Sequence, residues 1–209
     1  MTPLLLSATE ARVVAALSEK SISTPQYYPM TVNAIMLASN QKSSRDPVMQ
    51  LREGEVGAAL LDLAQKGLAA RDDAGSRVPK WRQLFQHHLL LQPPAFSVLV
   101  TLMLRGPQTQ AELRSNAAAL GGPADAEGIA RVIGDFAERA QPLAVLLPRA
   151  PGQKEQRYAH TLCGDPAAQP QPAPVTAREP VPERASLAGL EERLRELEAR
   201  VLALETRST

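Results

Sequence analysis

The polar side chains of residues 40–45 have the composition of a loop that contacts phosphates. In order they are Asn40, Gln41, Lys42, Ser43, Ser44 and Arg45. Lysine and arginine pair with phosphate groups, and neutral amides and hydroxyls add further hydrogen bonds. Arg52 stands close by, near the start of a predicted helix. The segment therefore predicts a contact with nucleic acid; the alternative is a solvated loop whose Asn and Ser side chains cap helix ends.

Two predicted β-hairpins carry a second set of basic side chains. These are Arg71, Arg77, Lys80 and Arg82 in the first hairpin and Arg149, Lys154 and Arg157 in the second. They could touch a nucleic acid backbone without reading its sequence. Acidic neighbours such as Asp72 and Glu155 leave ordinary solvated hairpins as the alternative. The predicted nucleic-acid contacts are Asn40, Gln41, Lys42, Ser43, Arg45, Arg52, Arg77 and Lys80.

The helix that precedes each hairpin is expected to be acidic on its exposed side. Residues 53–66 carry Glu53, Glu55 and Asp62, with Lys66 only at the far end. The equivalent residues of the second helix are Asp125, Glu127, Asp135 and Glu138, set against Arg131 and Arg139. Carboxylates repel the phosphate backbone. The pattern disfavours reading of the major groove by these helices and keeps open a protein-binding module without nucleic-acid contacts.

The sequence contains no pattern typical of catalysis or metal binding. It has no glycine-rich phosphate loop, nucleophile elbow or metalloprotease helix signature. His87 and His88 are adjacent, while His160 and the single Cys163 lie far away, so the spacing of a zinc site is missing. We therefore expect no catalytic residues, no metal, no cofactor and no enzyme activity.

Three aromatic side chains could stack on bases or pack inside the protein. Tyr27 and Tyr28 lie beside Pro25 and Pro29, and Trp81 stands on a predicted short strand. Buried aromatic rings contribute large apolar area, and a tryptophan N–H or tyrosine O–H is then usually hydrogen-bonded. We expect all three to pack against neighbouring elements.

An order of three helices followed by a hairpin occurs twice in residues 7–162. In the first copy the helices are predicted at about 7–20, 31–39 and 53–66, and Ser7 with Glu10 has the spacing of a capping box. In the second copy they are predicted at about 94–105, 109–120 and 125–139. This order is typical of the winged helix-turn-helix. We predict a mainly α chain with small β-hairpins (α+β), built as two tandem winged-helix domains at 1–92 and 93–162.

Several stretches of the chain resemble the YceH family of bacterial proteins. They are residues 22–34, which contain Tyr27-Tyr28-Pro29, residues 40–49, and the later segments 75–78, 104–109 and 151–160. The resemblance implies a tandem winged-helix fold and a family whose molecular activity is unassigned. It brings no catalytic residues. The chain has Ala38-Ser39 where relatives are expected to carry a cysteine.

The C-terminal part of the chain predicts a linker and a short coiled coil. Residues 163–185 are rich in proline and alanine and are predicted to be a flexible linker. Residues 186–207 carry three heptads whose a and d positions are Leu187, Leu190, Leu194, Leu197, Val201 and Leu204. Arg193 and Arg200 could reach Glu198 and Glu205 of a parallel partner. We expect a parallel homodimer; the alternative is a helix that folds back on its own chain.

The composition limits the function classes. The 209 residues have a net charge of +1, which gives no global field to attract nucleic acid. A single cysteine and the lack of a signal peptide or membrane-spanning segment favour a cytoplasmic location. We predict a protein resembling transcription regulators that contacts double-stranded DNA through residues 40–45 and the hairpins, with the protein-binding module as the alternative.

Overall fold

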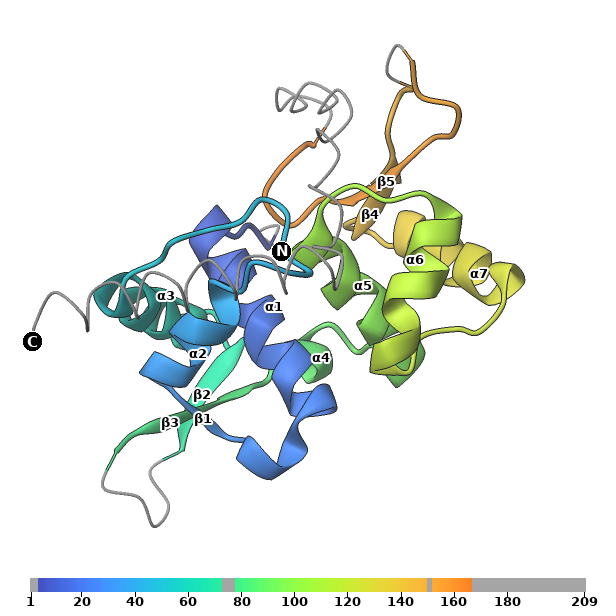
Figure 1. Cartoon of the computed structure of the whole chain (residues 1–209). Coiled ribbons are helices and arrows are strands. Elements are labelled where there is room, and N and C mark those ends of the chain that lie inside the picture. Colours follow the sequence, from blue (N-terminus) through green and yellow to red (C-terminus); the bar gives the residue numbers. More distant parts are fainter. Residues whose placement is uncertain (1–3, 73–77, 150–151, 167–209) are drawn as a thin grey trace, which may run out of the picture. The chain divides into compact units, whose positions relative to one another are not determined.

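The computed structural model describes residues 4–72, 78–149 and 152–166. All of these residues belong to one compact unit (Figure 1). The predicted linker at 163–185 lies mostly outside the described residues. Arg77 and the predicted coiled coil at 186–207, with its six a and d residues, lie wholly outside them.

The first half of the unit has three helices and a small antiparallel sheet. In chain order the elements are α1 (Ala8–Ser23), η1 (Pro25–Tyr27), β1 (Met30–Thr31), α2 (Val32–Ser39), α3 (Glu53–Gln65), β2 (Ala69–Asp72) and β3 (Lys80–Gln83). The predicted capping box begins α1, since the Ser7 hydroxyl accepts from the Glu10 amide and the Glu10 carboxylate accepts from the Ser7 amide. The strand order is β1-β3-β2, with Trp81 opposite both Met30 and Arg71.

The second half repeats this order after a short connecting helix. Its elements are α4 (Phe85–His88), α5 (Pro93–Arg105), α6 (Gln110–Ala117), η2 (Ala118–Leu120), α7 (Ala126–Ala137), β4 (Ala144–Leu146) and β5 (Tyr158–His160). β4 and β5 pair antiparallel, with Val145 opposite Ala159. The predicted α+β class and the order of three helices and a hairpin in each half are confirmed.

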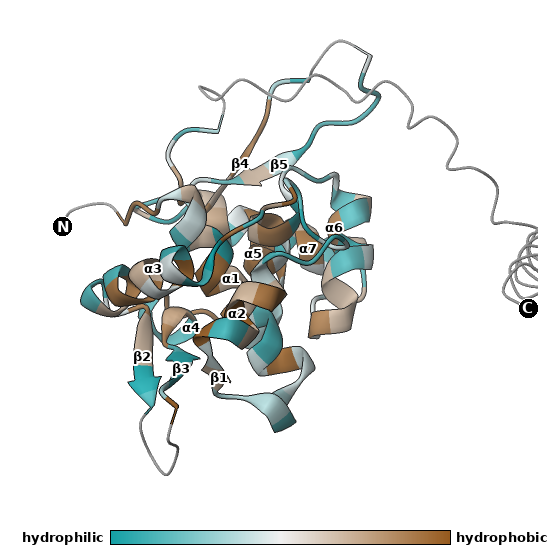
Figure 2. Ribbon diagram, turned by 60° about the vertical axis from the view of Figure 1, so that its left-hand side comes forward, coloured by the Kyte–Doolittle hydropathy of each residue, from teal (hydrophilic) through white to brown (hydrophobic). Residues whose placement is uncertain are grey.

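α1 and α5 lie at the centre of the unit and join its two halves. α1 packs against α2 and α3 on one side and against α5 on another (Figure 1). Every residue from Ala11 to Ser18 and from Phe96 to Leu104 is buried. A helix buried all round must be apolar on most faces, and the sequences of both helices satisfy this condition. Figure 2 shows the resulting apolar positions where the helices meet, and a hydrophilic end to β2.

The N-terminal residues of the first half also bind the second half. The Leu6 amide donates to the Leu162 carbonyl at 2.7 Å, and the side-chain amide of Gln141 pairs with the backbone of Leu4. The predicted boundary between residues 92 and 93 falls between α4 and α5. The division into two domains, one for each half, stays a prediction.

The aromatic side chains differ from expectation at one position. Trp81 is buried, and Tyr28 is half-buried with its hydroxyl accepting from the Gln83 amide, as packing predicts. Tyr27 is 75% exposed, so the expectation that it packs inside is wrong. It ends the η1 turn, whose residues are all at least partly exposed. No helix of the described residues is long and apolar enough to span a membrane.

Candidate functional site

Residues 40–52 join α2 to α3, and the Asn40 side chain links the beginning of this segment to its end. The Asn40 side-chain amide nitrogen donates to the Leu51 carbonyl and its oxygen accepts from the Leu51 amide, both at 2.8 Å. The asparagine side chain, with a donor and an acceptor, takes the place of a backbone partner for both the N–H and the C=O of Leu51. Asn40 was predicted to contact nucleic acid, but its polar atoms are already used to hold the segment.

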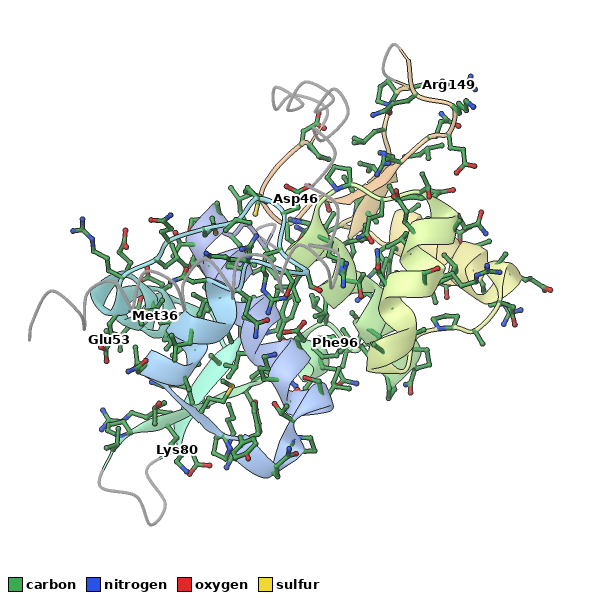
Figure 3. All side chains as sticks on the ribbon, in the orientation of Figure 1. Met36, Asp46, Glu53, Lys80, Phe96 and Arg149 are labelled. Carbon is green, nitrogen blue, oxygen red and sulfur yellow. The ribbon has the colours of Figure 1, made fainter. Side chains whose placement is uncertain are left out.

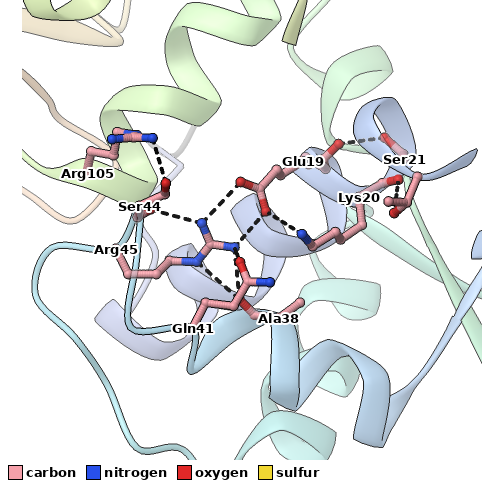
Figure 4. A network of polar contacts seen from close by, with 10 residues as sticks. Glu19, Lys20, Ser21, Ala38, Gln41, Ser44, Arg45 and Arg105 are labelled. Atoms are coloured by element: carbon pink, nitrogen blue, oxygen red, sulfur yellow. Dashed lines mark hydrogen bonds and ion pairs between the residues drawn. The ribbon is translucent and has the colours of Figure 1, made fainter. Parts of the chain in front are cut away.

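Arg45 lies inside the protein. Its guanidinium donates to the Ala38 carbonyl at 2.9 and 3.1 Å and to the Glu19 carboxylate at 2.6 and 3.1 Å. A further bond of 3.0 Å reaches the Gln41 side-chain oxygen (Figure 4). The side chain has no exposed surface. The expectation that Arg45 offers its charge to a phosphate is wrong, because the charge is neutralised and enclosed by α1 and the end of α2.

Further contacts fix the segment to both halves of the unit. The buried Arg12 of α1 donates to the Ser39 carbonyl at 3.2 Å and to the Pro47 carbonyl at 2.7 Å. From the second half, the Leu104 carbonyl accepts from the Asp46 amide at 2.8 Å. Arg105 donates to the Ser44 hydroxyl at 2.6 Å. Residues 40–47 therefore form a structural joint between α1, α2 and α5.

The remaining predicted contacts that the structure describes lie in this segment and on the hairpin. Lys42, Ser43 and Arg52 are exposed, and the Arg52 amide donates to Glu55 at the start of α3. Lys80 is half-buried on β3. Figure 3 places Lys80 well apart from Asp46 of the joint. Exposed or half-buried cations among the predicted contacts thus lie at two places, in the segment with Lys42 and Arg52 and on the hairpin with Lys80.

The basic side chains of the hairpins are partly paired with acids. Arg82 forms an ion pair with Asp72 across β2 and β3. Arg157 binds Glu112 through both guanidinium nitrogens, at 2.8 and 3.0 Å. Lys154 and Arg149 are exposed. Paired cations at the surface contribute less to phosphate attraction than free ones.

The exposed face of α3 combines carboxylates with an apolar side chain. Glu53, Glu55 and Asp62 are exposed, and Leu61 between them is 59% exposed. On the neighbouring α2, Leu37 is 63% exposed. Single exposed leucines are common on protein surfaces, so Leu61 matters here through its position on the same helix as the three carboxylates. Exposure of these acidic side chains agrees with the sequence prediction. The exposure of Leu61 does not follow from the sequence, because α3 has apolar residues on more than one face.

Burial and charge shift the pKa values of two carboxylates of α1. Burial raises the pKa of Glu19, but hydrogen bonds and charge attraction from Arg45 and Lys20 outweigh it and hold the pKa below the ordinary value. The same balance holds at Glu10, where Lys66 and the Ser7 cap lower the pKa against burial. Both carboxylates are therefore ionised structural groups at neutral pH.

The histidines do not form a metal site in the described residues. No three His, Cys, Asp or Glu side chains of that part of the chain lie close enough to hold a metal ion. Burial lowers the pKa of His160 to about 4. Its Nδ1 has no hydrogen-bond partner among the described atoms. His160 is accordingly a neutral packing residue at neutral pH.

Comparison with known proteins places the chain beside proteins without an assigned function. Residues 6–153 match a family model described as a protein of unknown function, DUF480. A UPF0502 protein of Geobacter sulfurreducens is 45% identical over 163 residues, covering 78% of this chain and 74% of the relative. A UPF0502 protein of Pseudomonas fluorescens is 42% identical over 205 residues, covering 97% and 91%. The name YceH does not occur among these descriptions and stays a prediction.

Proposed function

Since the chain belongs to the DUF480 family of proteins of unknown function, we propose that it is a tandem winged-helix protein that binds a protein partner through α3. The repeated order of three helices and a hairpin supports the winged-helix assignment. In a winged helix that binds DNA, the third helix is the element that enters the major groove. Fold alone does not give function, so the proposal depends on the surface chemistry of that helix.

The face of α3 carries the proposal. A DNA duplex at this face would meet the carboxylates of Glu53, Glu55 and Asp62, which repel phosphates. A basic protein surface with an apolar centre would instead gain charge pairing at the rim and bury Leu61. The partner that fits is therefore a protein with lysine or arginine around an apolar pocket.

The proposal is tested by recovering proteins bound to the full chain from cells that express it. Leu61→Glu should abolish recovery of the partner, because it places a charge at the centre of the interface. Ala130→Glu, at an exposed position of α7, is the matched control and should leave recovery unchanged. Equal loss with both variants, or no loss with Leu61→Glu, contradicts the proposal.

A second candidate function is a sequence-independent contact with double-stranded DNA. It is favoured by the exposed cations Lys42 and Arg52 and by Lys80 of the hairpin. Arg45 takes no part in it, because its charge is enclosed. A mobility shift on random duplex at low salt tests this candidate. A shift that Lys42→Glu and Lys80→Glu weaken, and Arg131→Glu does not, supports DNA binding; no shift at low salt counts against it.

A further inference from the structure

A polar cleft of about 280 Å³ lies between the two halves of the unit. Its walls come from α1, residues 41–44, α5, α6 and η2. The polar lining includes Glu19, Lys20, Gln41, Ser44, Arg105 and Asn116. Figure 4 shows the first five of these side chains: Glu19 and Gln41 bind Arg45, Lys20 binds Glu19, and Arg105 binds Ser44. The cleft belongs to neither the α3 face nor the hairpins.

The cations around the cleft exceed the carboxylates. Glu19 accepts two bonds from Arg45 and also pairs with Lys20 at 3.3 Å. The Lys20 side chain is only 19% exposed. Arg105 donates to the neutral Ser44 hydroxyl and forms no ion pair within the described part of the chain. Arg45 and Lys20 therefore share one carboxylate, and Arg105 adds a third positive charge to the lining.

Other charged groups nearby leave this excess unchanged. Arg12 interacts electrostatically with both Arg45 and Asp46. Counting Arg12 and Asp46 adds one cation and one carboxylate, so the group keeps a net excess of two positive charges. Poorly solvated charges are costly unless they are paired. An anion in the cleft would relieve this cost.

We infer that this cleft binds a small oxyanion, a phosphate or a carboxylate, between Lys20 and Arg105. A guanidinium can hold such a group with two parallel hydrogen bonds, and a lysine adds a point charge. The side-chain nitrogen of Gln41 and the Ser44 hydroxyl lie in the same lining and offer neutral donors. The volume is at the small end for ligand pockets, so the ligand is of metabolite size or smaller.

Binding at this place would strengthen the packing of the two halves. Lys20 belongs to α1 and Arg105 to α5, so one anion would bridge a helix of each half. A ligand that binds only the folded state stabilises it in proportion to the logarithm of its concentration over Kd. The inference does not depend on the proposed protein partner, because no residue of the α3 face lines the cleft.

The test is calorimetric titration of the full chain with sodium phosphate and, separately, with sodium malonate at low ionic strength. Sodium chloride at matched ionic strength measures the general salt effect. We expect saturable binding of phosphate or malonate, and whichever binds identifies the source of the oxyanion. Lys20→Gln and Arg105→Gln should each weaken it about tenfold, the factor that corresponds to about 1.4 kcal/mol. Arg131→Gln, which removes an exposed cation of α7, should not change it.

Three results would overturn the inference. These are no saturable binding of either anion, equal affinity in the wild type and both cleft variants, or equal weakening by Arg131→Gln. Thermal unfolding checks that each variant is folded. If Arg105→Gln is unfolded, Arg105→Lys takes its place, keeps the positive charge and should still bind the anion. Lys20→Gln should weaken binding in either case.

Discussion

Arg45 and Glu19 form an enclosed ion pair, with Nη2 2.6 Å from Oε2 and Nη1 3.1 Å from Oε1. The pair attaches the segment after α2 to α1, and the Ala38 carbonyl accepts two further bonds from the same guanidinium. Each charge of this enclosed pair needs the other, because a buried charge that loses its partner destabilises the fold. The polar residues 40–45, which look like a phosphate loop in the sequence, thus act mainly as a joint inside the protein.

Arg45→Gln should lower the free energy of unfolding by about 3–5 kcal/mol, the loss expected when one partner of a buried ion pair is removed. The Glu19 carboxylate would keep only the more distant Lys20. Urea unfolding at pH 7 measures the change. Arg131→Gln, an exposed residue, should stay within about 0.5 kcal/mol of the wild type. A loss below about 1 kcal/mol for Arg45→Gln would show that the pair is not a structural joint.

Asn40→Ala should lower the free energy of unfolding by about 1–3 kcal/mol, because both backbone groups of Leu51 lose their partner. The Leu51 amide should also exchange faster with solvent deuterium. Ser43→Ala, an exposed neighbour in the same segment, is the control and should change neither quantity. Unchanged exchange at Leu51 in Asn40→Ala would contradict the assigned role.

The sequence predicts local structure in this chain better than it predicts the direction of side chains. The Ser7 and Glu10 spacing predicts the helix cap because both partners lie within one turn. β1 has two residues and forms through its pairing with β3. Two residues are too few to show the alternation of apolar and polar side chains that predicts a strand. The partner of Arg45 on α1 is 26 positions away. Only the packing of α1 against α2 decides that this arginine faces inward.

Stability should fall as the pH drops from about 6.5 to about 4 because of His160. Its pKa is lowered to about 4 by burial, so the unfolded chain takes up the proton first. The full effect of one such group is about 3 kcal/mol. His160→Phe should flatten the dependence of the unfolding free energy on pH in this window, measured by denaturant unfolding at several pH values. The same slope in both proteins would contradict a buried neutral histidine.

The heptads at residues 186–207 predict a parallel dimer. Light scattering on the full chain should give the mass of two chains. Leu194→Asp, which places a charge at a central a position, should give the mass of one. Arg207→Ala, at the last residue of the predicted helix, is the control and should remain dimeric. A single-chain mass for the wild type would contradict the pairing and favour a helix that folds back on its own chain. A dimer in Leu194→Asp would show that the heptads do not hold the two chains together.

The most direct test of the proposed function is photo-crosslinking from α3 in living cells. A photoreactive amino acid replaces Leu61 in one chain and Ala130 of α7 in another, both at exposed positions. We expect one discrete crosslinked protein from position 61, which disappears when Glu53 and Glu55 are changed to lysine, and none from position 130. Crosslinks to DNA from position 61, or the same products from both positions, would contradict it.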